Sequence, residues 1–259
     1  MPLDLLVFGP HPDDIEIGLG GTVARHVALG FRVGLCDLTV GEMASNGTPE
    51  QRLAEAEAAR EVLGAAWREN LRLPDGGLAP ESAGQVRAVV EMVRRWQPRV
   101  VAAPHDRDRH PDHAGASRLL TRAVFMAGLR RYPHGGDPWR PDWICYYFVN
   151  DADRPSFVVD VSRYYDVKRR ALACHVSQFG APADERVSTR LTSSRFRQLI
   201  ESRDAQFGAG AGVAFAEGIV VREPLVRPDL FKHRDADSGT GPGEWDALSV
   251  SEDEWPRWE

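Results

Sequence analysis

Short apolar runs alternate with amphipathic segments along the first 127 residues, and this alternation constrains the fold more than any other feature of the sequence. The predicted strands are residues 3–8, 31–39, 67–73 and 99–103. Segments with helical periodicity follow each of them. Because alternating strands and helices form parallel sheets with helices on both faces, we predict an α/β fold with a mostly parallel sheet.

Local signals set the ends of the predicted helices. Thr48 is a good N-cap, Pro49 suits the first helical position, and Gly64 ends the helix. The first helix is predicted at residues 20–30, ended by Gly30, after a tight turn that holds His11, Asp13 and Asp14. Further helices are predicted at residues 82–96, 113–127, 164–175 and 195–207, and later strands at residues 144–149, 157–161 and 213–221.

Two clusters of polar residues follow two of the predicted strands. His11, Asp13 and Asp14 follow the first strand, and His110 and His113 follow the fourth. With right-handed crossovers and the common strand order 3-2-1-4-5, the first and fourth strands are neighbours. Because ligands bind at the carboxyl ends of strands in such sheets, we expect the two clusters to form one site.

The residue types in these clusters suit a metal-dependent hydrolase. Adjacent carboxylates at Asp13 and Asp14 repel each other, and a divalent cation relieves that repulsion. Two imidazoles and one carboxylate are a common zinc set with an open position for water. One aspartate could bind the metal while the other accepts the water's proton, and a cationic His110 could stabilise an oxyanion. The alternative is a solvated turn, since Pro, Asp and Gly commonly form turns.

The chain resembles the PIG-L/LmbE-like family of zinc-dependent N-acetylglucosamine deacetylases over about residues 3–230. The resemblance rests on three stretches, His11-Pro12-Asp13-Asp14-Ile15-Glu16, Asp37-Leu38-Thr39-Val40-Gly41-Glu42 and His110-Pro111-Asp112-His113. It is closest to the bacillithiol-pathway deacetylase of N-acetylglucosaminyl malate, through residues 4–18 and 108–113, Ser45-Asn46-Gly47-Thr48 and Ser177-Gln178-Phe179.

The resemblance implies a Rossmann-like fold and a role for each matching residue. His11, Asp14 and His113 would bind Zn²⁺, with Fe²⁺ as the alternative metal. Asp13 would be the general base and His110 the electrophilic or acid group. The remaining implied residues are Asp112, which would orient an imidazole, and Arg52, Arg109 and Asn46, which would bind the substrate.

The expected reaction is removal of the acetyl group from an N-acetylglucosaminide by a metal-activated water. The expected substrate is N-acetyl-glucosaminyl-L-malate, because two arginines can bind two carboxylates. Alternatively, both arginines pair only with local acids such as Glu55 or Asp108. Alternative substrates are a mycothiol-type precursor, a thiol-conjugate amide or a chitooligosaccharide. A sugar- or nucleotide-binding module without catalysis is the non-enzyme alternative.

Composition excludes several other classes of protein. The formal charge of −6 lies entirely in the last 26 residues, which hold eight acids and two bases. The remainder has no basic excess to attract nucleic acid or an anionic membrane. Widely spaced Cys36, Cys145 and Cys174, with no signal peptide, indicate a cytoplasmic protein. We predict one deacetylase domain at residues 1–231, an acidic disordered tail at 232–259 and, by family resemblance, a homohexamer.

Overall fold

The computed structural model describes residues 2–180 and 187–226, and their strands form one sheet. The strand order is β3-β2-β1-β4-β5-β7-β6. Strands β1 to β5 are parallel, whereas β7 runs antiparallel to both β5 and β6. The strands are β1 (Leu5–Gly9), β2 (Val33–Asp37), β3 (Trp67–Asn70), β4 (Val100–Pro104), β5 (Trp143–Tyr147), β6 (Phe157–Asp160) and β7 (Ala216–Val220).

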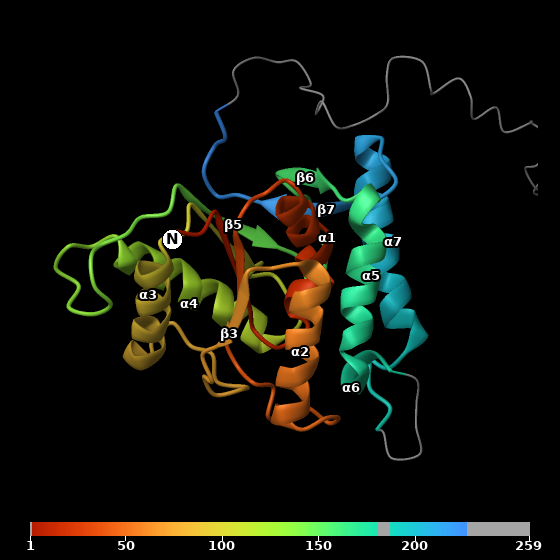
Figure 1. Ribbon diagram of the computed structural model, residues 1–259, viewed down its shortest axis with the longest axis horizontal. Coiled ribbons are helices and arrows are strands. Elements are labelled where there is room, and N and C mark those ends of the chain that lie inside the picture. Colours follow the sequence, from red (N-terminus) through yellow and green to blue (C-terminus); the bar gives the residue numbers. More distant parts are fainter. Residues whose placement is uncertain (1, 181–186, 227–259) are drawn as a thin grey trace, which may run out of the picture. The chain divides into compact units, whose positions relative to one another are not determined.

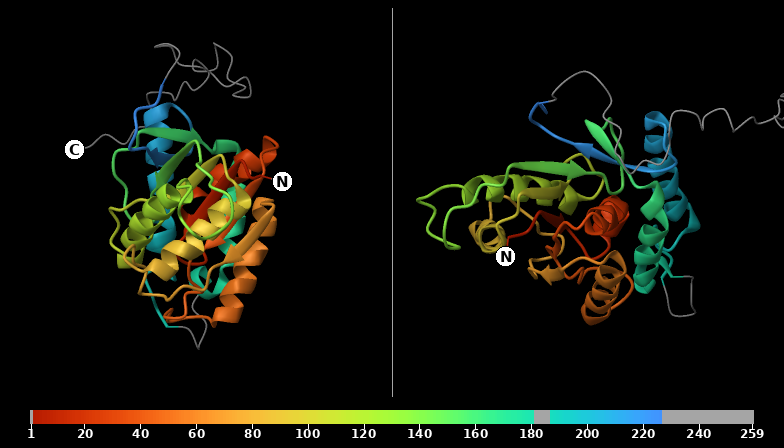
Figure 2. Two further views of the ribbon diagram at one scale, coloured as in Figure 1. Left: turned by 90° about the vertical axis from the view of Figure 1, so that its left-hand side faces the viewer. Right: turned by 45° about the horizontal axis from the view of Figure 1, so that its top comes forward.

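Helices cover both faces of this sheet (Figure 1). On one face lie α3 (Ala83–Trp96) and α4 (Pro111–Ala127), and on the other lie α1 (Asp14–Ala28) and α2 (Pro49–Leu63). Outside α1 and α2, α5 and α7 lie side by side, as the right-hand view of Figure 2 also shows. The remaining helical elements are η1 (Ser162–Tyr164), α5 (Tyr165–Cys174), α6 (Val176–Phe179) and α7 (Ser194–Ala211).

The predicted α/β fold and the order of the first five strands are confirmed. The predicted caps of α2 are confirmed as well, because Thr48 accepts a hydrogen bond from the Gln51 backbone and Gly64 ends the helix with φ 73°. Two separate hydrophobic clusters, one on each face of the sheet, account for the apolar periodicity of the strands and helices. Buried Cys36 and Cys145 belong to these clusters, as predicted.

The predicted start of the first helix at Gly20 is wrong, because α1 begins at Asp14. Gly18 and Gly21 both lie inside this helix, where they allow close packing. A Cβ atom on Gly18 would lie 2.2 Å from the Tyr147 ring, and one on Gly21 would lie 2.7 Å from Val161. The first turn of α1 therefore holds the two acidic residues Asp14 and Glu16.

A buried ion pair joins α1 to the edge of the sheet. Arg68 of β3 donates to Glu16 at 2.5 Å and to Asp37 of β2 at 2.7 Å. All three side chains are at most 3 % exposed. Burial raises the pKa of Glu16, but Arg68 and His175 outweigh it and lower the pKa to about 2. Glu16 thus has a structural role in holding α1 against the strands.

The compact unit ends at Arg222, and the predicted acidic tail lies outside the described residues. Among the helices of the described ranges, none combines the length and the apolar character needed to cross a bilayer.

Replacing Arg68 should destabilise the protein strongly. Arg68→Met leaves two buried carboxylates without their cation, and we expect a loss of about 3–5 kcal/mol in the free energy of unfolding. The matched control is Arg95→Met, which removes the exposed pair between Arg95 and Glu69 and should cost less than about 1 kcal/mol. Urea unfolding of the full chain measures both, and equal losses would contradict a structural role for the buried pair.

Candidate metal centre and active site

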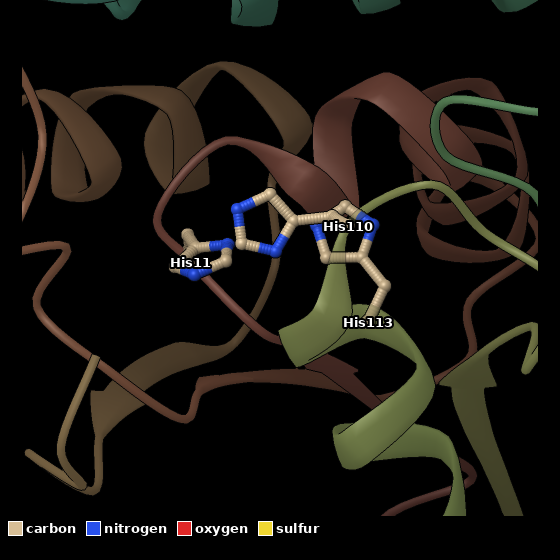
Figure 3. A group of neighbouring side chains, drawn as sticks. All are labelled: His11, His110 and His113. Atoms are coloured by element: carbon tan, nitrogen blue, oxygen red, sulfur yellow. The ribbon is translucent and has the colours of Figure 1, made fainter. Parts of the chain in front are cut away.

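A cavity of about 210 Å³ opens at the carboxyl ends of the parallel strands. Both predicted clusters line it, because β1 and β4 are hydrogen-bonded neighbours. The turn after β1 contributes His11, Asp13 and Asp14, and the segment that begins α4 contributes His110 and His113. The three imidazoles gather between these two segments (Figure 3). The two clusters therefore lie together at one cavity, as predicted.

The Asp14 carboxylate lies between two of these imidazoles. Its Oδ2 atom is 3.0 Å from Nδ1 of His11 and 3.2 Å from Nε2 of His113. The backbone N–H of His11 also donates to Oδ2 at 3.0 Å, which fixes the carboxylate in the turn. All three residues are at most 8 % exposed. One carboxylate oxygen and two ring nitrogens are thus held together out of bulk water.

Further carboxylates contact the second ring nitrogen of His11 and of His113 and so orient both rings. Nδ1 of His113 lies 3.1 Å from Asp108, and Nε2 of His11 lies 3.1 Å from Asp75 and 3.4 Å from Asp112. When each ring donates its proton to these carboxylates, its other nitrogen presents a lone pair toward Asp14. Carboxylates that orient the far nitrogen in this way are typical of histidine ligands in metal sites.

This donor set fits a zinc-sized ion. Tetrahedral bonds of about 2.0–2.1 Å place ligand atoms about 3.3 Å apart, close to the two distances around Asp14. Among the described residues, two groups have ligand atoms that all lie within 4.8 Å of one another: His11 with His110 and His113, and His11 with Asp75 and Asp112. Asp14 contacts two members of the first group, His11 and His113. In the second group, Asp112 already accepts hydrogen bonds from the backbones of Gly76 and Leu78. We therefore assign Asp75 and Asp112 to orientation of His11.

The electrostatics of the three candidate ligands also favour a cation. Burial lowers the pKa of His113, but Asp14 and Asp108 outweigh burial and raise the pKa to about 9. Burial likewise opposes charge on His11, yet Asp112, Asp14 and Asp75 raise its pKa above the usual value. Burial raises the pKa of Asp14, whereas His113 and His11 lower it overall. Positive charge at this position is therefore stabilised by the surrounding carboxylates.

Asp13 lies beside these ligands in a strained conformation. Its φ angle is 133°, which L residues rarely adopt and which costs about 1–3 kcal/mol. The residue is 2 % exposed, and its Oδ2 atom accepts no hydrogen bond among the described residues, although a guanidinium nitrogen of Arg52 lies 3.5 Å away. Burial raises the pKa of Asp13 to about 6, although Arg52 acts in the opposite direction. A buried carboxylate oxygen is thus free to accept a proton at the cavity.

His110 lines the cavity from the N-terminus of α4. Its Nδ1 atom accepts a hydrogen bond from the Asp112 backbone at 3.2 Å, and its ring stacks on His113 with centroids 4.7 Å apart. Because Nδ1 is an acceptor, the neutral ring carries its proton on Nε2. Burial and the nearby rings of His11 and His113 lower the pKa of His110. His110 is therefore arranged as a neutral hydrogen-bond donor, rather than as the cation expected from the sequence.

The three predicted substrate-binding residues have different surroundings. Arg52 lines the cavity but is 4 % exposed, and it donates to the carbonyls of Pro12 at 2.8 Å and Gly41 at 3.2 Å. It also lies 3.5 Å from Asp13. Arg109 is exposed, and Asn46 binds the backbone of Val187. Neither Arg109 nor Asn46 is among the described residues that line the cavity.

Four residues that contribute to the site were not assigned to it from the sequence. Asp75 follows β3 and Asn150 follows β5, so their position after a parallel strand was a usable signal. Asp108 was weighed only as a partner of Arg109, whereas it contacts His113. Gln178 lines the cavity from α6, far along the chain, and no local pattern predicts that contact.

Known proteins show similarity over most of the chain. The family model described as GlcNAc-PI de-N-acetylase (PIG-L) matches residues 6–124. Diacetylchitobiose deacetylase of Thermococcus kodakarensis is 30% identical over 88% of this chain and 85% of its own length. The 1D-myo-inositol 2-acetamido-2-deoxy-alpha-D-glucopyranoside deacetylase of Rhodococcus opacus is 30% identical over 67% of this chain and 81% of its own.

Among solved structures, a conserved protein of Thermus thermophilus matches with a TM-score of 0.81. It is 40% identical, and the match covers 89% of this chain and all of that one. The predicted family resemblance is thus supported by sequence and structure comparisons together.

The metal ligands can be identified by measuring bound metal in variants. We expect Asp14→Asn and His113→Ala to lose most bound zinc, because a site with three protein ligands has none to spare. The matched control is His110→Ala, which should keep its zinc because the ring is assigned as a donor. Elemental analysis of the purified proteins provides the measurement. Loss of zinc from His110→Ala with retention in Asp14→Asn would instead identify the three histidines as the ligands.

Proposed function

This chain belongs to the PIG-L/LmbE family of N-acetylglucosaminide deacetylases, and we propose that its cavity hydrolyses the acetamide of such a sugar with His11, Asp14 and His113 holding a divalent metal. One observation carries the proposal. The Asp14 oxygen lies at ligand spacing from both imidazoles, while adjacent Asp13 keeps at the same cavity a buried oxygen that accepts no hydrogen bond and has Arg52 at 3.5 Å. Adjacent carboxylates are thereby separated into a metal ligand and a base.

The metal, proposed to be zinc, supplies Lewis acidity and lowers the pKa of a water molecule. Asp13 is placed to accept the proton from the attacking water, because it lines the cavity and its buried Oδ2 accepts no hydrogen bond among the described residues. Arg52, 3.5 Å from this oxygen, opposes the effect of burial on the carboxylate and holds the turn through Pro12. His110 can donate from Nε2 to the carbonyl oxygen or to the departing amine. Asp112 maintains the orientation of both His11 and His110.

Glucosaminyl malate is the substrate expected from the closest family resemblance. That expectation needs two arginines for the malate carboxylates, yet Arg52 already binds two carbonyls and Asp13. Gly41 confirms how closely Arg52 is packed, since a Cβ atom there would lie 1.7 Å from a guanidinium nitrogen. A malate aglycone would therefore depend on exposed Arg109. The relatives act on other glycosides by name, a diacetylchitobiose and an inositol glucosaminide.

Acetate release tests the proposed reaction directly. Zinc-loaded protein should release acetate from N-acetylglucosaminides, and chelation should abolish the release until metal is restored. Comparing the malate, inositol and chitobiose glycosides ranks the finer substrate proposals. Failure of the metal-loaded protein to release acetate from all of them would contradict the proposed function.

The role of Asp13 predicts a separation of metal binding from turnover. Asp13→Asn should retain its metal while kcat falls by about 10²–10⁴-fold, the usual range for loss of a general base. Asp106→Asn is the control, because Asp106 is exposed and lies outside the described lining of the cavity. Metal loss from Asp13→Asn equal to that from Asp14→Asn would show that both aspartates are ligands.

The position of Arg52 predicts a loss that does not depend on the aglycone. Arg52→Lys removes a fork that binds the Asp13 turn, so kcat/KM should fall about 10-fold or more on every N-acetylglucosaminide. Arg60→Lys in the same helix, where the arginine pairs with exposed Glu57, should change little. Steady-state kinetics on malate and inositol glycosides distinguish a structural role of Arg52 from a role in binding malate. A loss confined to the malate glycoside would restore Arg52 as a malate ligand.

A further inference from the structure

Part of the lining of the catalytic cavity is apolar. Met43 and Ala44 contribute from the loop after β2, and Leu191 and Phe196 contribute from the start of α7 and the segment before it. The ligand cluster lies on the turn after β1 and at the starts of α1 and α4, so these four apolar residues come from different elements. In a cavity of about 210 Å³, a substrate whose acetamide lies at the metal would bring its remaining groups within reach of them.

Met43 is the most exposed of these four apolar residues. It is 73% exposed, although its backbone is fixed by a hydrogen bond to Asp75 at 3.0 Å. Its sulfur lies 2.9 Å from where a Cβ on Gly76 would be, so the side chain crosses the Asp75–Gly76 turn. When a ligand covers such an exposed apolar side chain, apolar surface is removed from water, and this lowers the free energy of the complex.

Phe196 is a fixed member of the apolar lining. It is 2% exposed, and its ring stacks on Phe179 with centroids 6.3 Å apart. Leu191, which precedes α7, is half-buried beside it in the lining. A buried aromatic ring, a leucine and a methionine make a surface that suits an aryl or alkyl group.

The charges around the cavity disfavour an anionic group. Asp13, Asp14 and Asp75 line it, and Arg52 is the one arginine or lysine among its described lining residues. Because Arg52 is held by Asp13 and two carbonyls, it is not free to pair with a carboxylate of the aglycone, which would meet Asp75 away from the proposed metal. An uncharged group therefore suits this cavity better than a dicarboxylate.

We propose that Met43, Leu191 and Phe196 form a subsite for an uncharged, apolar aglycone, so that the preferred substrate is an N-acetylglucosaminide carrying an aryl or alkyl group. This inference rests on the proposed function for the position of the sugar. It makes Met43 a specificity-determining residue, because Met43 is the exposed member whose contact depends on the aglycone.

Binding of the deacetylated products tests the subsite without turnover. Isothermal titration calorimetry would compare phenyl glucosaminide, methyl glucosaminide and glucosaminyl malate, all of one anomer, on zinc-loaded protein. We expect the phenyl glycoside to bind about 10-fold more tightly than the methyl glycoside, and the malate no more tightly than the methyl one. Met43→Ser should reduce the phenyl preference to less than about threefold. Leu199→Ser is the control, because it also replaces an exposed apolar side chain with serine, on α7 and outside the described lining of the cavity. It should leave the phenyl preference unchanged.

Equal affinity for phenyl and methyl glycosides, tighter binding of the malate, or a phenyl preference that survives Met43→Ser would each overturn the subsite. Acetate release from the N-acetylated forms of the same glycosides is measured in parallel. Absence of acetate release together with a Met43-dependent phenyl preference would contradict the proposed reaction while supporting the subsite, so the two failures are distinguishable.

Discussion

The contact of one carboxylate oxygen with two imidazoles is the interaction on which the site depends. Asp14 stands at the first position of α1, His11 in the turn before it, and His113 in the first turn of α4. The pairing of β1 with β4 brings these helix starts together. Because three buried polar groups would otherwise repel or remain unpaired, the arrangement is stable only with protons or a metal ion between them.

Strain at Asp13 is balanced by the structure around it. The chain adopts a positive φ at this residue, and Arg52 braces the turn by binding Pro12 and Gly41. Close packing of Gly18 on Tyr147 then holds α1 against the sheet directly after this turn. The two consecutive carboxylates therefore have different surroundings: Asp14 contacts the imidazoles, whereas Asp13 keeps an oxygen that accepts no hydrogen bond and lies 3.5 Å from Arg52.

Sequence alone predicted the order of the first five strands and the meeting of the two clusters, because strand periodicity and right-handed crossovers determine both. It did not predict the positions of β6 and β7. It did not predict the start of α1, since glycines that usually mark turns here pack against Tyr147 and Val161. Nor did it predict the surroundings of Arg52 and Asn46. Both residues occur in polar segments typical of ligand binding, but tertiary contacts with Asp13 and Val187 engage them. Contacts between distant segments, such as Gln178 and the cavity, have no local signal.

The position of the metal is tested most directly by anomalous diffraction from crystals of zinc-loaded protein. The ligand assignment predicts a zinc peak about 2.0–2.2 Å from Nδ1 of His11, an Asp14 oxygen and Nε2 of His113. It also predicts that Asp13 and His110 lie near the peak without binding it. A peak on the other side of His11, bonded to Asp75 and Asp112, would contradict the assignment and the roles derived from it.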